Sequence, residues 1–65
     1  MSDQDRRRVQ ALLATMGYYS GRIDGTFGPE TRAAIRRYQF EIKVELTGRL
    51  NAEQATRLVN GTRRE

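Results

Sequence analysis

The stretch GYYSGRIDGTFGPET, residues 17–31, decides how this chain folds. It contains four of the six glycines and the only proline, with aromatic and aliphatic residues between them, and Asp24 lies at its centre. Glycine permits turns that other residues resist, and proline is favoured at the first position of a helix. We therefore expect a structured loop that ends at residues 28–31, where a helix begins.

Apolar residues recur with the spacing of one helical face on both sides of this loop. Residues 3–16 place them at i, i+3, i+4 and i+7, which predicts a helix capped by Ser2 or Asp3 and ended by the first loop glycine. The same spacing after the loop predicts a second helix from Pro29 to about Phe40.

A third helix is predicted at about 51–60, with Asn51 as its cap and residues 61–65 frayed. Its start, GRLNAE at 48–53, repeats the pattern of GTFGPE at 25–30. In both, a glycine turn is followed by a large apolar residue that can act as a staple, then a cap and a first-turn glutamate. Internal duplication and shared helix-start chemistry both explain this similarity.

The predicted fold is all-α: a compact three-helix domain with a structured glycine- and aromatic-rich loop between its first two helices. Residues 1–65 form a single domain with a core at about 6–60. A short hairpin around Asp24 is the alternative, because Asp-Gly between apolar residues also favours a hairpin turn. The expected core residues are Val9, Leu12, Leu13, Met16, Tyr18, Ile23, Phe27, Ala34, Ile35, Tyr38, Leu46, Leu50, Leu58 and Val59.

The loop itself is expected to be built by turn chemistry. Asp24 can accept hydrogen bonds from the backbone amides of the turn that it begins. Ile23 and Phe27 are expected to anchor the loop in the core, and Tyr18 is expected to be more buried than Tyr19. The residues assigned to the loop framework are Gly21, Asp24, Gly25, Phe27, Gly28 and Thr31.

The composition argues against catalysis, cofactors and metals. The chain has no histidine and no cysteine, which removes the commonest general base and the commonest metal ligands. Asp24 and Glu30 could form a pair of catalytic carboxylates, but a small three-helix domain offers no deep cleft for a sugar ring. A calcium loop needs several alternating oxygen ligands, whereas Arg22 lies beside a single aspartate here. We predict no enzyme activity, no cofactor and no metal site.

The net charge is +4, and all but one of the twelve basic residues are arginine. Arginine favours carboxylate and phosphate partners, because its planar fork binds oxyanions through two hydrogen bonds. No apolar run approaches the length of a membrane span, so membrane insertion is not expected. The first ten residues lack the apolar segment of a secretory signal.

These features resemble the type 1 peptidoglycan-binding domain family. Residues 9–39 are similar to the family pattern VQ-x-x-L-x-x-x-GY-x-x-G-x-x-DG-x-FG-x-x-T-x-x-A-(apolar)-x-x-(aromatic)-Q, and residues 46–59 resemble its closing portion less strictly. The matching positions in the first string are Val9, Gln10, Leu13, Gly17, Tyr18, Gly21, Asp24, Gly25, Phe27, Gly28, Thr31, Ala34, Ile35, Tyr38 and Gln39.

The resemblance implies a non-catalytic, monomeric three-helix module that attaches a larger protein to the bacterial cell wall. The implied partner is peptidoglycan or a muropeptide. The implied location is the cell envelope, the periplasm or outside the cell, provided that the chain is part of a longer exported protein. The sequence departs from the family pattern at two places. Residues 40–46, beside Gln39, lack the glycine of the family's Q-x-x-x-G-L connection, and Gln54 in the closing helix replaces a threonine.

Tyrosine faces can pack on sugar CH groups, and arginines can bind the carboxylates of peptidoglycan peptides. A protein–protein interaction module on the same fold is the main alternative. Nucleic-acid binding through the arginines of the second helix is not expected, because a long loop replaces the short turn of a helix-turn-helix. The predicted ligand contacts are Tyr19, Arg22, Arg32, Arg36 and Gln39.

Overall fold

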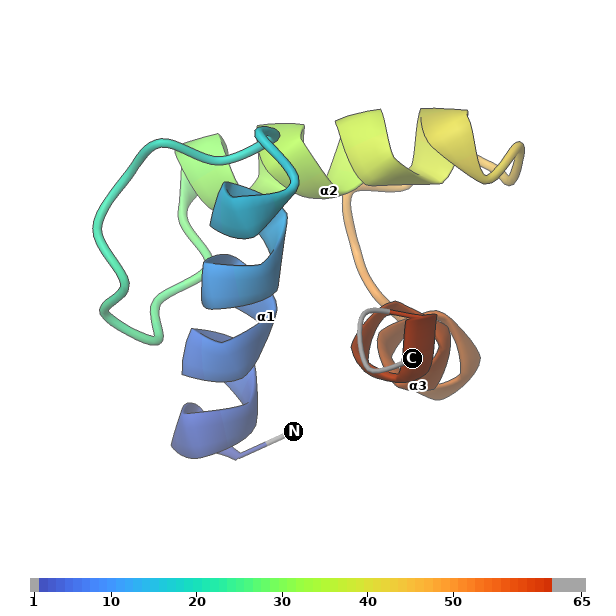
Figure 1. Cartoon of the computed structure of the whole chain (residues 1–65). Coiled ribbons are helices and arrows are strands. Elements are labelled where there is room, and N and C mark those ends of the chain that lie inside the picture. Colours follow the sequence, from blue (N-terminus) through green and yellow to red (C-terminus); the bar gives the residue numbers. More distant parts are fainter. Residues whose placement is uncertain (1, 62–65) are drawn as a thin grey trace.

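The computed structural model describes residues 2–61, and the side chains of residues 2–59. This part of the chain forms three helices, α1 (Asp3–Thr15), α2 (Pro29–Glu41) and α3 (Ala52–Gly61). Helix α2 lies across one end of α1, and α3 packs beside α1, on the side away from the first loop (Figure 1). Residues 2–61 contain no strand, so the predicted all-α fold is confirmed and the alternative hairpin is not formed.

The helices begin where their caps were predicted. Ser2 Oγ accepts a hydrogen bond from the Asp5 N–H at 3.1 Å, and the Asp5 carboxylate accepts one from the Ser2 N–H in return. Gly28 precedes Pro29 at the start of α2. Asn51 Oδ1 accepts from the Gln54 N–H at 2.7 Å at the start of α3. The chain is helical to Gly61, the first of the residues predicted to fray, and residues 62–65 lie outside the described part of the chain.

Helices α1 and α2 each end in a turn with the same hydrogen-bond pattern. At the end of α1, Gly17 has φ +88°, and the Tyr18 N–H donates to the Leu13 carbonyl at 2.9 Å. At the end of α2, Lys43 has φ +62°, and the Val44 N–H donates to the Gln39 carbonyl at 3.1 Å. Lysine thus adopts the left-handed conformation that glycine favours, and the turn forms without the glycine of the family pattern.

Replacing Lys43 by glycine is expected to stabilise the domain by about 0.5–1 kcal/mol. A left-handed φ costs an L-residue roughly 1–2 kcal/mol, and the greater freedom of glycine in the unfolded chain offsets part of this gain. Chemical unfolding measures the effect, with Lys43→Ala as the matched control because alanine retains the strain. Equal stabilisation by both substitutions would show that strain at this position is not the cause.

The core lies between the three helices and beneath the first loop. Phe27 packs against it, as predicted. Met16, Ile23 and Leu46 are exposed, so their assignment to the core was wrong. Ile23 and Leu46 precede turns whose backbone N–H groups face inward, which leaves their own side chains outside. The buried apolar cluster consists of Val9, Leu13, Tyr19, Ala34, Ile35, Tyr38 and Leu58.

The burial of the two tyrosines is the reverse of the prediction. Tyr19 is 8% exposed, whereas Tyr18 is only partly buried. The Tyr19 N–H still bonds to the Leu13 carbonyl, which turns the ring under the loop, and its hydroxyl donates to the Arg22 carbonyl. A buried tyrosine needs a partner for its hydroxyl, and the returning loop supplies one.

Candidate functional site

The first loop is hydrogen-bonded on its inner side to Gln10, whose side chain is fully buried. Its Oε1 accepts from the N–H groups of Asp24 at 3.1 Å and Gly25 at 2.8 Å. Its Nε2 donates to the Thr26 carbonyl at 2.9 Å and to Thr31 Oγ1 at 3.0 Å. We call this arrangement the first glutamine clasp. It fixes the loop to α1 and to the start of α2.

Gln39, also fully buried, forms a second glutamine clasp on the connection between α2 and α3. Its Oε1 accepts from the Gly48 N–H at 3.0 Å. Its Nε2 donates to the Arg49 carbonyl at 2.8 Å, and to Thr47 Oγ1 and Gln54 Oε1, each at 3.1 Å. Gln54 therefore accepts the hydrogen bond that Thr31 accepts in the first clasp.

The two clasps explain why the two helix starts look alike in sequence. Gly48 and Arg49 make the contacts that Gly25 and Thr26 make in the first clasp. Both glycines have positive φ, +79° at Gly25 and +76° at Gly48. The repeated pattern thus marks a repeated hydrogen-bond requirement: a left-handed turn whose N–H faces a buried amide. Duplication and convergence both satisfy it.

Asp24 builds the turn, as predicted. Its Oδ1 accepts from the Thr26 N–H at 2.9 Å and from Gln10 Nε2 at 3.3 Å. These hydrogen bonds, first from Thr26 and then from Gln10, hold the pKa of the carboxyl below its ordinary value, because they favour the charged form. Asp24 therefore has all the partners that a turn-building residue needs.

This pKa shift predicts a pH dependence of folding. Because the folded-state pKa of Asp24 is lowered, its contribution to stability is full above the ordinary value of 3.8 and is lost as the pH falls through the folded-state value. Asp24→Asn keeps the acceptor oxygen but does not titrate, so its stability should fall less between pH 6 and pH 2 than that of the parent. Urea unfolding at a series of pH values measures the difference, and parallel curves would contradict the prediction.

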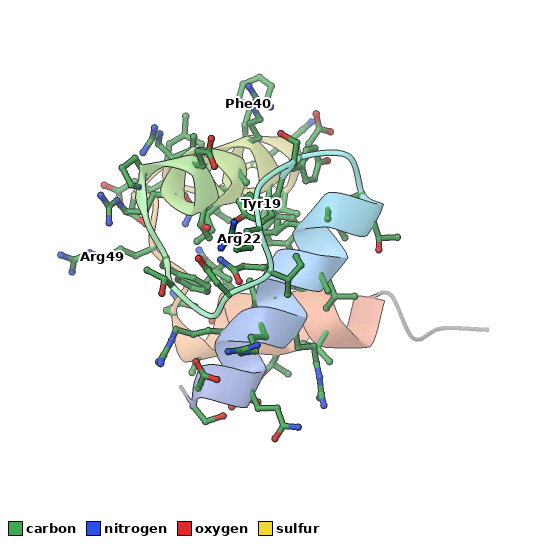
Figure 2. All side chains as sticks on the ribbon, turned by 90° about the vertical axis from the view of Figure 1, so that its left-hand side faces the viewer. Tyr19, Arg22, Phe40 and Arg49 are labelled. Carbon is green, nitrogen blue, oxygen red and sulfur yellow. The ribbon has the colours of Figure 1, made fainter. Side chains whose placement is uncertain are left out.

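The five predicted ligand contacts do not form one surface. Tyr19 and Gln39 lie inside the fold with their polar atoms bonded to the loops. Figure 2 shows Tyr19 pointing inward under the loop, whereas Phe40 and Arg49 point away from the body of the molecule. Arg22 is exposed on the loop.

The arginines on α2 are exposed, and Arg32 and Arg36 lie near different connections of the chain. Arg32 Nη1 donates to the Phe27 carbonyl at 3.1 Å, which ties it to the loop that precedes the helix. Arg36 lies over the second connection, since a methyl group built on Gly48 would be 3.2 Å from its Nη1. Neither Arg36 nor Arg37 makes a side-chain hydrogen bond or an ion pair with another described residue.

A hollow of about 530 Å³ lies on the outer face of α2, and we call it the α2 hollow. Phe40 is 68% exposed at its edge, and Leu46 from the second connection is 49% exposed. A smaller hollow of about 150 Å³ adjoins it along the helix and includes Tyr19, Ser20 and Glu30. The residues that line the α2 hollow are Tyr18, Ala33, Arg36, Arg37, Phe40, Glu41 and Leu46.

Of the predicted contacts, only Arg36 lies in the α2 hollow. The sequence did contain a signal for its neighbours: Ala33, Arg37 and Phe40 share one face of α2 at i, i+4 and i+7. These three residues were not included among the predicted contacts. Tyr18 was assigned to the core, and its place at the hollow follows from the inward turn of Tyr19.

A second hollow of about 530 Å³ lies between α1 and α3. Small aliphatic side chains dominate its lining, and its two charges, Asp5 and Arg8, have opposite signs. It contains no aromatic residue and no surplus charge. It therefore offers less to a polar, anionic ligand than the α2 hollow does.

Among residues 2–61, none of the helices has the length and hydrophobicity of a membrane span. The described side chains also include no group of three or more acidic, histidine or cysteine residues placed to hold a metal ion.

Residues 2–58 match the family model described as "Putative peptidoglycan binding domain". Helices α1 and α2, both clasps and most of α3 lie within this match. No solved structure gives a significant match.

Three curated relatives match this chain over a small part of their own length. The "Spore cortex-lytic enzyme" of Halalkalibacterium halodurans is 39% identical over 83% of this chain and 16% of its own length. The "Putative OxPP cycle protein OpcA" of Synechocystis sp. is 54% identical over 63% of this chain and 9% of its own length. The "Localization factor PodJL" of Caulobacter vibrioides is 41% identical over 77% of this chain and 5% of its own length. The chain thus spans less than a fifth of each relative.

Proposed function

Because the chain belongs to the peptidoglycan-binding domain family, we propose that it is a non-catalytic module that binds peptidoglycan through the α2 hollow and attaches a larger protein to the cell wall. The matching family is a family of binding domains, which supports binding without catalysis. The similarity to a spore cortex-lytic enzyme over a small part of that protein supports a role as one domain of a longer, wall-associated chain.

One observation carries the choice of surface. Arg36 and Arg37, which have no side-chain partner among the described residues, line the same hollow as Phe40, which is 68% exposed. Large exposed apolar side chains beside polar groups are a feature of binding sites. The ring of Phe40 can pack on CH groups, and the guanidinium groups of Arg36 and Arg37 can bind carboxylates through two hydrogen bonds each.

The other predicted contacts take different parts in this proposal. Tyr19 and Gln39 are positioning residues, since they hold the two loops that carry Tyr18 and Leu46 to the hollow. Arg22 and Arg32 stay predicted contacts on the exposed surface outside the hollow.

Sedimentation with purified sacculi tests the proposal. The double substitution Arg36→Ala with Phe40→Ala is expected to weaken binding about tenfold or more, because it removes a charge-assisted contact and an apolar contact together. Both side chains are exposed, so the fold should survive. The matched control is Arg49→Ala with Ile23→Ala, which removes an exposed arginine and an exposed apolar side chain outside the hollow.

Each outcome of this experiment has a distinct meaning. Binding that is lost only in the Arg36/Phe40 variant supports the α2 hollow. Binding that survives in that variant but falls in the control places the ligand elsewhere. If the parent protein does not sediment with sacculi, the proposed function is wrong.

A protein-interaction module on the same fold is the second candidate function. The aliphatic hollow between α1 and α3 favours it, because its lining suits an apolar side chain better than a sugar. Similarity to proteins named "Localization factor PodJL" and "Putative OxPP cycle protein OpcA" is also compatible with it. This candidate is favoured if the immobilised protein retains soluble proteins but does not bind sacculi, and if Ala55→Arg in that hollow abolishes the retention.

A further inference from the structure

We propose that the α2 hollow binds the carboxylate-bearing peptide of peptidoglycan and not its sugar chain. This inference rests on the proposed function and makes it more specific. The ligand class is an acidic peptide with small apolar side chains, whose carboxylate lies against Arg36 and Arg37.

The first argument is the balance of donors and acceptors in the hollow. A sugar hydroxyl both donates and accepts, so sugar sites usually combine the two kinds of group. The hollow instead presents two guanidinium groups, which only donate, and its lining includes one carboxylate, Glu41, and one hydroxyl, that of Tyr18. Two cations against one anion leave a surplus positive charge, which favours a negatively charged ligand.

The second argument is that both guanidinium groups are available. Among the described residues neither Arg36 nor Arg37 has a hydrogen-bond or ion-pair partner for its side chain, so a ligand carboxylate displaces no internal contact. In contrast, Arg7 is bonded to Asp3 at 2.9 Å, and Arg32 to the Phe27 carbonyl at 3.1 Å. Arg8 and Arg49 also lack such a partner among the described residues, but the α2 hollow brings two arginines of this kind together.

The third argument is the apolar part of the lining. Ala33, Phe40 and Leu46 surround the arginines with a surface that can bury methyl groups but offers no hydrogen bond to a ring of hydroxyls. Peptidoglycan peptides carry methyl side chains next to carboxylates, whereas its sugars carry mainly hydroxyls and acetamides. The volume of about 530 Å³ lies within the range of sites that hold small ligands.

The test separates peptide from sugar in the same material. Purified sacculi are digested with an amidase that cuts the peptides from the glycan strands, and the stripped strands are then coupled to beads so that they can be sedimented. The protein is expected to sediment with intact sacculi and about tenfold less with stripped strands. Chemical shifts should move at Arg36, Arg37 and Phe40 on titration with the released peptides, and the affinity should fall about tenfold once the peptide carboxylates are converted to amides.

Matched variants tie this discrimination to the hollow. Arg36→Gln with Arg37→Gln should remove the difference between intact and stripped sacculi, whereas Arg49→Gln with Arg57→Gln, which changes the net charge equally, should keep it. Equal sedimentation with stripped and intact material, or equal affinity for amidated and free peptide, overturns the inference while the proposed function stands. Absence of sedimentation with intact sacculi overturns both.

Discussion

Replacing Gln10 by alanine is expected to lower the free energy of unfolding by about 3–5 kcal/mol. The substitution leaves the N–H groups of Asp24 and Gly25 without their acceptor, and the Thr26 carbonyl without its donor. Each buried polar group that loses its partner costs about 1–3 kcal/mol, and the empty space of the side chain adds to this. A domain of this size has a total stability of only about 3–10 kcal/mol, so much of the population should unfold.

Circular dichroism with urea unfolding measures this effect, and Gln4→Ala is the matched control on the exposed side of the same helix. Gln39→Ala should rank between them, because its Oε1 accepts from one backbone N–H where that of Gln10 accepts from two. A loss below about 1 kcal/mol for Gln10→Ala would show that water replaces the amide and that the clasp does not determine stability.

The helices could be predicted because their signals are local. The period of the apolar residues located α1 and α2, and the caps fixed the starts of α1 and α3 to within a residue or two. Asp24 is similar, since its hydrogen bond to the Thr26 N–H joins residues two positions apart. Wherever the deciding contact lies within one turn of the chain, the sequence carries the necessary information.

The burial of the loop residues depended on contacts that no local pattern displays. Tyr19 is buried because its hydroxyl meets the Arg22 carbonyl after the chain turns back. Ile23 is exposed because Gln10, from another helix, draws the next two N–H groups inward. A polar residue at the centre of the fold runs against the usual separation of apolar and polar residues, so both clasps were missed.

The candidate site was predicted only in its chemistry. Arginine beside an aromatic residue was the expected combination, and Arg36 with Phe40 provides it, but the aromatic residue was taken from the loop instead of from α2. The reason is again long-range: Leu46 and Tyr18 reach the outer face of α2 through the two connections. Their joint position depends on how the three helices cross.

The second large effect is expected at the glycines of the first loop. The sequence indicates the same role for Gly21 and Gly28, whereas the structure gives them different surroundings. Gly21 and Gly28 both have ordinary φ values, but their surroundings differ. A methyl group on Gly21 would lie 2.7 Å from the Tyr19 hydroxyl and 2.8 Å from Tyr19 Cζ, whereas a methyl group on Gly28 meets nothing within 4 Å. Tyr19 is buried and bonded to the loop, so it has little room to move.

Gly21→Ala is therefore expected to cost about 2–3 kcal/mol, the range for forcing extra volume into a packed site. Gly28→Ala should change stability by less than about 0.5 kcal/mol. Alanine is less favourable than glycine as a helix cap, but it also reduces the freedom of the unfolded chain, and the two effects offset each other. Urea unfolding of both variants measures the difference. If the cost at Gly21 comes from the Tyr19 hydroxyl, the two substitutions Gly21→Ala and Tyr19→Phe must cost less together than the sum of their separate effects. Additive costs would place the clash at the Tyr19 ring or at Glu30 Oε1, which would lie 2.7 Å from the methyl group, and not at the hydroxyl.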